Sequence, residues 1–181
     1  SEQKRSARAP FTTSTLQQTA SSRLGFSPKR TMQVAQKLYE AGHITYMRTD
    51  STTISVDAKA EIKSLILKSY GENYFEERVY KTKSKNAQEA HEAIRPAGDA
   101  FRTPGQIAGE VSPDELKLYE LIWKRTLASQ MSDALGTTMT VRFGRGPLAI
   151  ASASSNTAVD PDASSSAPLK IVSPVVPRLP R

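Results

Sequence analysis

The sequence predicts a mainly α-helical protein with a short β element, and three observations support this prediction. Four segments place apolar residues three and four positions apart, which is the period of an amphipathic helix. Each of these segments begins at a serine, a residue that caps helix N-termini, and in two of them a proline follows the serine. Strand-like patterns are confined to two short stretches, residues 44–47 and 137–143.

The first two predicted helices are joined by a short glycine-containing turn, which indicates a helix-turn-helix. A capping box marks the start of the first helix at Ser14, and Gly25 ends it. The second helix starts at Ser27, because the next residue is a proline that fits the first helical position, and it ends at Gly42. With the strand-like residues 44–47, this pair predicts a winged-helix-like topology. The apolar faces comprise Leu16, Ala20 and Leu24 in the first helix, and Met32, Ala35, Leu38 and Tyr39 in the second.

Two longer helices are predicted further along the chain. One is capped by Ser55 and covers residues 56–70, where Gly71 ends it. The other has the clearest start in the sequence, because Ser112 combines a capping box with a proline at the first helical position. One or two helical turns are also expected over residues 88–94. The apolar stripes of the two longer helices comprise Ala58, Ile62, Leu65 and Ile66, and Leu116, Tyr119, Ile122, Trp123 and Leu127.

The predicted organisation has four parts. Residues 1–10 are a linker or a strand from a preceding region, residues 11–135 form a helical domain, and residues 136–144 form a strand that begins a further β-rich region. Residues 145–181 hold six of the eleven prolines, seven serines and no aromatic residue. Such a segment cannot bury enough apolar surface to offset its ordering entropy, so a disordered tail is expected. A tail of this kind can serve as a linker to a protein partner.

Composition narrows the classes of function. The net charge is +7, and residues 1–50 hold eight Lys and Arg against three Asp and Glu. A positive field of this kind attracts a polyanion such as nucleic acid, although basic proteins of other functions share it. The chain has no cysteine, which excludes disulfides and thiolate-ligated zinc within it. No apolar run reaches the ~18–20 residues of a membrane span, so a cytoplasmic, nucleoid-associated protein is expected.

Three polar residues spaced two apart, Tyr46, Arg48 and Asp50, form the first candidate site. In an extended strand they share one face, while the intervening residues point the other way. A phenol oxygen can act as nucleophile toward a phosphodiester, and a forked guanidinium stabilises charge on phosphoryl oxygens. The same spacing also fits an exposed strand edge on which Arg48 simply pairs with Asp50.

His91, one of only two histidines, is the second candidate. A protonated imidazole can donate to a phosphate oxygen, and a nearby carboxylate such as Asp50 would favour this charged form. The alternative is an ordinary surface histidine on a short helix. Glu89 and Glu92 lie three residues apart, but no further ligand follows at a suitable spacing, so they indicate a solvated helix face rather than a metal site.

Three motifs taken together resemble bacterial type IA DNA topoisomerases, in particular the topoisomerase I branch. The first spans residues 8–18 and reads Arg-Ala-Pro-Phe-Thr-Thr-Ser-Thr-Leu-Gln-Gln. The second, residues 38–51, contains Thr-Tyr-Met-Arg-Thr-Asp, and the third, residues 88–96, reads Gln-Glu-Ala-His-Glu-Ala-Ile-Arg-Pro. The motifs follow one another in the order that the family shows, and the resemblance covers about residues 5–143.

The resemblance implies a role for each matching position. Tyr46 matches the catalytic tyrosine, and Arg48 the arginine that contacts the scissile phosphate. Asp50 and His91 match a pair that tunes phosphate binding and DNA affinity. Arg95 matches a motif position and is grouped with the DNA-binding residues without an individual role. The helical region then corresponds to the tyrosine-bearing domain, and the strand after it begins the β-rich arch that opens around DNA.

The reaction that the resemblance implies is a reversible transesterification by an isomerase. The tyrosine attacks a phosphodiester in single-stranded DNA, forms a 5′-phosphotyrosine and frees a 3′-hydroxyl, which reseals the gap after another strand has passed. Negative supercoils are relaxed without ATP, because the phosphotyrosine retains the bond energy. Single-stranded or negatively supercoiled DNA is therefore the expected substrate, and a monomer is expected.

The sequence also departs from the family. Members carry a TOPRIM domain that holds acidic magnesium ligands, and neither that domain nor most of the arch is visible in this sequence. The Mg²⁺ expected for the full enzyme is therefore assigned to the TOPRIM domain, and this chain is expected to bind no metal and to be an incomplete fragment. The alternative is a non-catalytic winged-helix module that binds DNA. A tyrosine recombinase is disfavoured, because the arginines and histidine of such a site are not found.

Overall fold

The computed structural model describes residues 2–80, 91–98 and 100–137, which fall into two compact units. The smaller described unit is a two-stranded antiparallel ribbon of β1 (Glu2–Arg5) and β2 (Ala134–Thr137). Its register pairs Glu2 with Thr137 and Arg5 with Ala134. The predicted strand over residues 137–143 thus begins earlier than expected, and residues 138–143 lie outside the described residues. Within residues 1–10, for which a linker or a strand from a preceding region was expected, Glu2–Arg5 form a strand.

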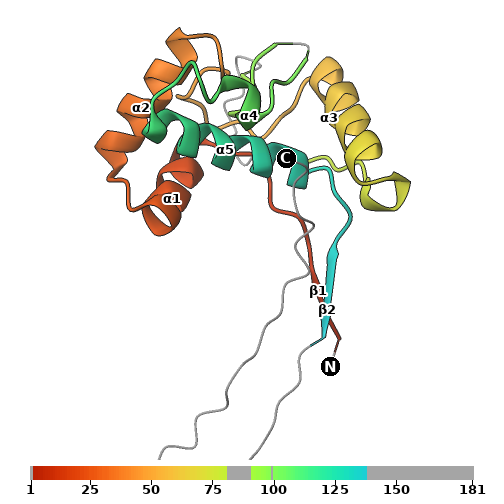
Figure 1. Ribbon diagram of the computed structural model, residues 1–181. Helices are drawn as coiled ribbons and strands as arrows, with labels where there is room; N and C mark the ends of the chain where they lie inside the picture. Colours follow the sequence, from red (N-terminus) through yellow and green to blue (C-terminus); the bar gives the residue numbers. More distant parts are fainter. Residues whose placement is uncertain (1, 81–90, 99, 138–181) are drawn as a thin grey trace, which may run out of the picture. The chain divides into compact units, whose positions relative to one another are not determined.

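The larger unit contains the described residues between Ser6 and Asp133 and is helical. Helix α5 packs against α1, α2, α3 and α4, so it is the element around which the unit is built (Figure 1). The core of fully buried side chains includes Phe11, Leu16, Leu38, Ile62 and Ile122. The elements in chain order are α1 (Thr13–Leu24), α2 (Pro28–Glu40), α3 (Val56–Ser69), the 3-10 turn η1 (Glu72–Tyr74), α4 (Pro104–Ile107) and α5 (Pro113–Ala128).

The predicted helix starts are confirmed for α2, α3 and α5, each capped by the expected serine. The start of α1 was predicted at Ser14, which is wrong: the capping box lies at Thr12 and Thr15. The cause is long-range, because Phe11 bridges to Ile94 and its backbone stays extended. The chain therefore turns into the helix at the next residue, Thr12, whose hydroxyl accepts from the Thr15 amide.

Two predictions about local structure are corrected. Tyr39 was assigned to the buried face of α2 but is 43% exposed, because Val34 and Leu38 fill that face instead. The helical turns expected over residues 88–94 are absent from the described residues 91–94, which are not helical and form one β-bridge, at Ile94. Their backbone amides are used in long-range bonds, such as that from Ile94 to the Phe11 carbonyl at 2.8 Å, and these exclude a helix. Residues 88–90 lie outside the described part.

The winged-helix-like topology is not confirmed. Helices α1 and α2 form and pack as the helix-turn-helix prediction requires. Between Ser6 and Asp133, however, the described residues form isolated β-bridges rather than strands, and residues 44–47 contribute only the bridge from Ile44 to Pro96. A wing therefore cannot be recognised, and the short elements η1 and α4 were not predicted.

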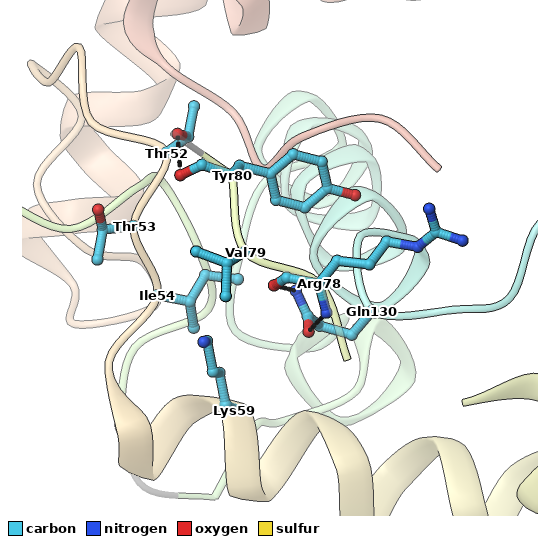
Figure 2. Close-up of a pocket in the computed structure, with 8 residues that line it drawn as sticks. All are labelled: Thr52, Thr53, Ile54, Lys59, Arg78, Val79, Tyr80 and Gln130. Carbon is cyan, nitrogen blue, oxygen red and sulfur yellow. Dashed lines mark hydrogen bonds between the residues drawn. The ribbon is translucent and has the colours of Figure 1, made fainter. Parts of the chain in front are cut away.

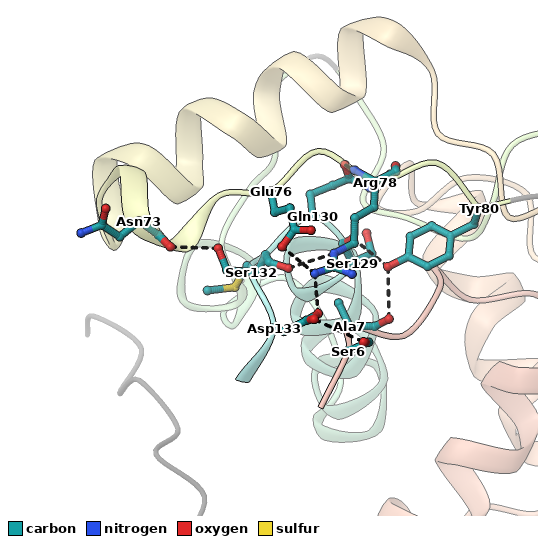
Figure 3. A network of polar contacts seen from close by, with 11 residues as sticks. Ser6, Ala7, Asn73, Glu76, Arg78, Tyr80, Ser129, Gln130, Ser132 and Asp133 are labelled. Carbon is teal, nitrogen blue, oxygen red and sulfur yellow. Dashed lines mark hydrogen bonds and ion pairs between the residues drawn. The ribbon is translucent and has the colours of Figure 1, made fainter. Parts of the chain in front are cut away.

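The two described ends of the helical unit are joined by a polar network, shown in Figure 3. The Ser6 hydroxyl donates to the Asp133 carboxylate at 3.3 Å. Arg78 pairs with Asp133 and also with Glu76, its guanidinium lying 2.7 Å from the latter. The Tyr80 hydroxyl lies 2.9 Å from the Ser129 carbonyl oxygen. The chain therefore enters and leaves the helical unit at one place.

Candidate active site around Tyr46

The loop that carries Tyr46 begins at the end of α2. The His43 amide donates to the Leu38 carbonyl at 2.8 Å and the Gly42 amide to the Tyr39 carbonyl at 2.9 Å, which is a Schellman motif. Gly42 has a φ of 78°, a left-handed conformation that residues with a side chain rarely adopt. The turn stops the helix and sends the chain directly toward Tyr46.

Exposure alternates along this loop as the sequence predicted for a strand. Tyr46, Arg48 and Asp50 are exposed, whereas Met47 and Thr49 between them are buried. The expected common direction of the three polar side chains is thus consistent with their exposure, although the segment is not paired in a sheet. Within the described residues Arg48 and Asp50 form no ion pair with each other, so the alternative of a simple surface pair is not observed.

The first residue of α1 holds this loop from one side. The Thr13 hydroxyl donates to the Met47 carbonyl at 2.7 Å and accepts from the Thr49 amide at 2.9 Å. The Thr13 amide donates to the Thr49 carbonyl at 2.9 Å. That amide is one of the helix N-terminal donors that has no partner within the helix, and the loop supplies one. Buried residues Met47 and Thr49 are therefore fixed, which fixes the exposed residues between and beside them.

Residues 91–96 hold the loop from the other side. The Thr45 amide donates to the Arg95 carbonyl at 2.9 Å, and the Thr45 hydroxyl donates to the Ala93 carbonyl at 2.8 Å. The Arg95 amide donates in turn to the Thr45 hydroxyl at 3.0 Å. Three segments that are distant in the sequence and correspond to the three motifs are thus joined by backbone hydrogen bonds.

A cavity of about 280 Å³ opens at this junction and is lined by Thr45, Tyr46, Thr49, His91 and Glu92. Its volume is close to the lower end of the ~300–1,000 Å³ range of ligand pockets. The structure brings Tyr46 and His91 to one cavity and adds Glu92, which was assigned to a solvated face from the sequence. Arg48 and Asp50 follow Tyr46 in the sequence and are exposed, but they do not line this cavity.

Tyr46 itself is 45% exposed. Its ring meets that of Tyr39 edge to face, with ring centroids 5.2 Å apart and an interplanar angle of 68°. Edge-to-face contact is a favoured geometry for aromatic pairs. Among the described residues the phenol oxygen of Tyr46 has no hydrogen-bond partner, so it is available to a ligand.

Glu92 and Arg95 form an ion pair that holds the segment next to His91 in place. The Glu92 carboxylate accepts from the Ser55 amide at 2.8 Å and from two guanidinium nitrogens of Arg95 at 2.6 and 3.1 Å. Burial alone would raise the pKa of Glu92, but the hydrogen bonds from Ser55 and Arg95 outweigh it and the pKa is lowered. Sequence reasoning missed this role, because the partner Ser55 lies far away in the chain.

Arg95 was grouped with the DNA-binding residues, and its surroundings point to a positioning role. The residue is buried, and its third guanidinium nitrogen donates to the Pro96 carbonyl at 2.8 Å. The guanidinium also lies over the Phe101 ring, 5.7 Å from its centroid. With its donors used in this way, Arg95 organises the segment of His91, and a direct contact with DNA stays a prediction.

A second hollow is formed by residues 52–54, α3, residues 78–80 and Gln130 (Figure 2). Its volume is about 40 Å³, room for a water molecule or two rather than a ligand. The Gln130 side chain bonds both the amide and the carbonyl of Arg78, at 3.0 and 3.1 Å. Because the volume is small and Gln130 and Arg78 bond each other across it, we interpret this hollow as a packing feature of the helical unit.

Within the described residues no three His, Asp or Glu side chains gather into a group that could hold a metal ion. Near Tyr46 the carboxylate of Glu92 is already engaged by Arg95. No magnesium site is shown among the described residues, and no chemical step is assigned to a metal here. No described helix is both long and apolar enough to cross a membrane.

The structure joins the three motifs around an exposed tyrosine, and comparison with known proteins gives the family. A family model described as DNA topoisomerase matches residues 1–160, and the chain belongs to this family, the bacterial type IA DNA topoisomerases. The family's enzymes are isomerases.

Individual relatives agree with this assignment. The chain is similar to the DNA topoisomerase 1 of Mycolicibacterium smegmatis, with 59% identity over 138 residues, which are 75% of this chain and 15% of that protein. It is also 59% identical to the DNA topoisomerase 1 of Streptomyces coelicolor over 143 residues, 78% of this chain and 15% of that protein. The structure of full-length topoisomerase I from Thermotoga maritima matches with a TM-score of 0.65 and 44% identity, covering 77% of this chain and 23% of that one. The chain thus spans less than a quarter of these relatives.

Proposed function

We propose that this chain carries the nucleophile of a type IA DNA topoisomerase. The phenol oxygen of Tyr46 attacks a backbone phosphorus of single-stranded DNA and loses its proton. The bond from phosphorus to the 3′-oxygen breaks, and that oxygen leaves as a 3′-hydroxyl after taking up a proton, while the 5′-phosphate stays on the tyrosine. The reverse reaction reseals the strand. The observation that carries the proposal is the exposed phenol of Tyr46 at a cavity shared with His91, on a loop fixed from both sides.

The neighbouring residues have roles that suit this chemistry. Arg48 is exposed two residues from Tyr46, where its guanidinium can reach the phosphoryl oxygens of a bound strand and stabilise their charge. His91 lines the cavity and can donate to a phosphate oxygen when protonated. Asp50, exposed on the same loop, would limit the affinity for phosphate by its negative charge.

The activity as a whole belongs to the longer enzyme. The magnesium-binding TOPRIM domain and the arch are the partners that this chain needs for strand passage and relaxation of negative supercoils. The role of this chain is to supply the nucleophile and part of the contact with single-stranded DNA. The bond energy retained in the phosphotyrosine makes ATP unnecessary.

A covalent-trapping assay tests the proposal. The chain is mixed with 3′-labelled single-stranded DNA and Mg²⁺, with and without a separately expressed TOPRIM half, and resolved on a denaturing gel. We expect an adduct that requires the complementing half and disappears in Tyr46→Phe. Tyr74→Phe is the matched control, because Tyr74 is 46% exposed and lies outside the cavity. An adduct that survives in Tyr46→Phe would exclude Tyr46 as the nucleophile.

The second candidate function is a DNA-binding module without chemistry of its own. The chain spans 15% of the length of its DNA topoisomerase 1 relatives, and this short span favours the alternative for the isolated chain. It predicts DNA binding that Tyr46→Phe leaves unchanged, and no adduct under either condition of the same assay.

A further inference from the structure

Three arginines of the helical unit, Arg8, Arg23 and Arg125, lie close enough for the charges of the first two to act on the third, and none of them lines the Tyr46 cavity. We call these three residues the arginine cluster. Arg125 on α5 is the half-buried member. Its guanidinium lies 4.2 Å from the centroid of the Phe11 ring and donates to the Ala9 carbonyl at 3.3 Å. A stacked guanidinium keeps its remaining N–H groups directed to the side, where they can form a forked contact.

The other two members bring like charges toward it. Arg8 precedes Ala9, Arg23 lies in the last turn of α1, and both are exposed. Burial, and then the charges of Arg8 and Arg23, lower the pKa of Arg125, and no described carboxylate opposes them. An arginine nevertheless stays charged at neutral pH. The cluster thus concentrates positive charge at a cost to the stability of the free protein.

The remaining arginines of the helical unit differ from the cluster in their contacts with carboxylates. Four of them are each paired with a carboxylate, and these pairs are Arg30 with Asp114, Arg78 with Asp133, Arg95 with Glu92, and Arg102 with Glu110. Among the described residues of this unit, the arginines without such a pair are Arg48, beside Tyr46, and the three members of the cluster.

We propose that the arginine cluster is a second contact for backbone phosphates of the single-stranded DNA that Tyr46 engages. This inference rests on the proposed function. The Phe11 ring carries Arg125, and the Phe11 carbonyl accepts from the Ile94 amide at 2.8 Å, in the segment that positions His91. The cluster and the cavity are therefore built on the same short stretch of chain. Forked guanidinium groups suit the oxygens of a backbone phosphate.

The salt dependence of DNA binding tests this inference. The full chain with Tyr46→Phe is titrated into a fluorescent single-stranded oligonucleotide over a range of salt concentrations, so that no covalent chemistry is needed. Arg8→Gln, Arg23→Gln and Arg125→Gln should each weaken binding roughly tenfold at low salt. Each should also lower the slope of log K against log salt by about 0.7, the value for one phosphate contact on a single strand.

Two controls keep the result specific. Arg102→Gln removes the same charge from an exposed pair with Glu110, and we expect it to leave the slope unchanged. Arg125→Lys keeps the charge and should retain most of the slope if Arg125→Gln fails to fold. Wild-type slopes in the three cluster variants, or equal losses in Arg102→Gln, would overturn the inference. The adduct assay reports on Tyr46 separately, so a failure of the nucleophile and a failure of the cluster are distinguishable.

Discussion

Replacing Glu92 by glutamine tests the support beneath the candidate site. The carboxylate accepts one hydrogen bond from the Ser55 amide and two from Arg95, and its side chain is 27% exposed against 11% for that of Arg95. Glutamine can keep the bond from Ser55 but loses the charge and turns an amide N–H₂ toward the guanidinium. Arg95 is then left with a poorly compensated buried charge.

The expected cost can be derived from these contacts. A hydrogen bond to a charged group contributes about 1.5–3 kcal/mol, and breaking a fully buried ion pair costs about 3–5 kcal/mol. Because this pair is partly exposed and one bond is kept, we expect Glu92→Gln to lower the free energy of unfolding by about 2 kcal/mol. His91 should lose its position as well, so adduct formation should fall at temperatures where the variant is folded.

Urea unfolding followed by the fluorescence of Trp123, the single tryptophan, measures this change. The midpoint should fall while the slope m is kept. Glu110→Gln is the control, because its pair with Arg102 is exposed and its loss should change the midpoint far less. If Glu92→Gln unfolds at the same urea concentration as Glu110→Gln, the ion pair does not stabilise this segment and the reasoning is refuted.

Three further predictions follow from the same geometry. Burial raises the pKa of Tyr119 to about 12, so the neutral phenol stabilises the fold fully below pH 10. About 2–3 kcal/mol of the free energy of unfolding is lost as the pH rises through 12. Unfolding measured at alkaline pH should show this loss in the wild type and not in Tyr119→Phe. Thr13→Val removes the hydroxyl bonds to Met47 and Thr49, and should cost about 2 kcal/mol in urea unfolding and lower the adduct yield of the folded protein. Arg48→Ala should reduce adduct yield far more than thermal stability, because Arg48 is exposed; a large drop in melting temperature would make Arg48 structural instead.

Much of the helical architecture could be predicted because its signals are local. A capping serine and an amphipathic stripe are enough to specify α3 and α5. The errors occur where a distant segment decides the outcome. Phe11 pairs with Ile94, which shifts the start of α1 and keeps the residues near His91 extended. Nothing in the sequence around Phe11 or Ile94 indicates that these two residues pair.

The candidate site likewise combines residues that local sequence patterns predict with residues whose role depends on long-range contacts. The polar residues of the Tyr46 loop could be found from their spacing and from the family motif, and the exposure of Tyr46 agrees with it. The groups that hold the loop could not be found in this way. Thr13 acts through the unpaired amide of a helix start, and Glu92 acts through Ser55, so both depend on the completed fold.

The joined ends of the helical unit also have a mechanical consequence. A pull that separates the two chain segments meets the β1–β2 pairing first, because Arg5 and Ala134 are paired next to Ser6 and Asp133. The hydrogen bond between Ser6 and Asp133 and the Arg78 pair with Asp133 come next along the chain. The packed helices of the unit are therefore loaded only after these contacts have been broken.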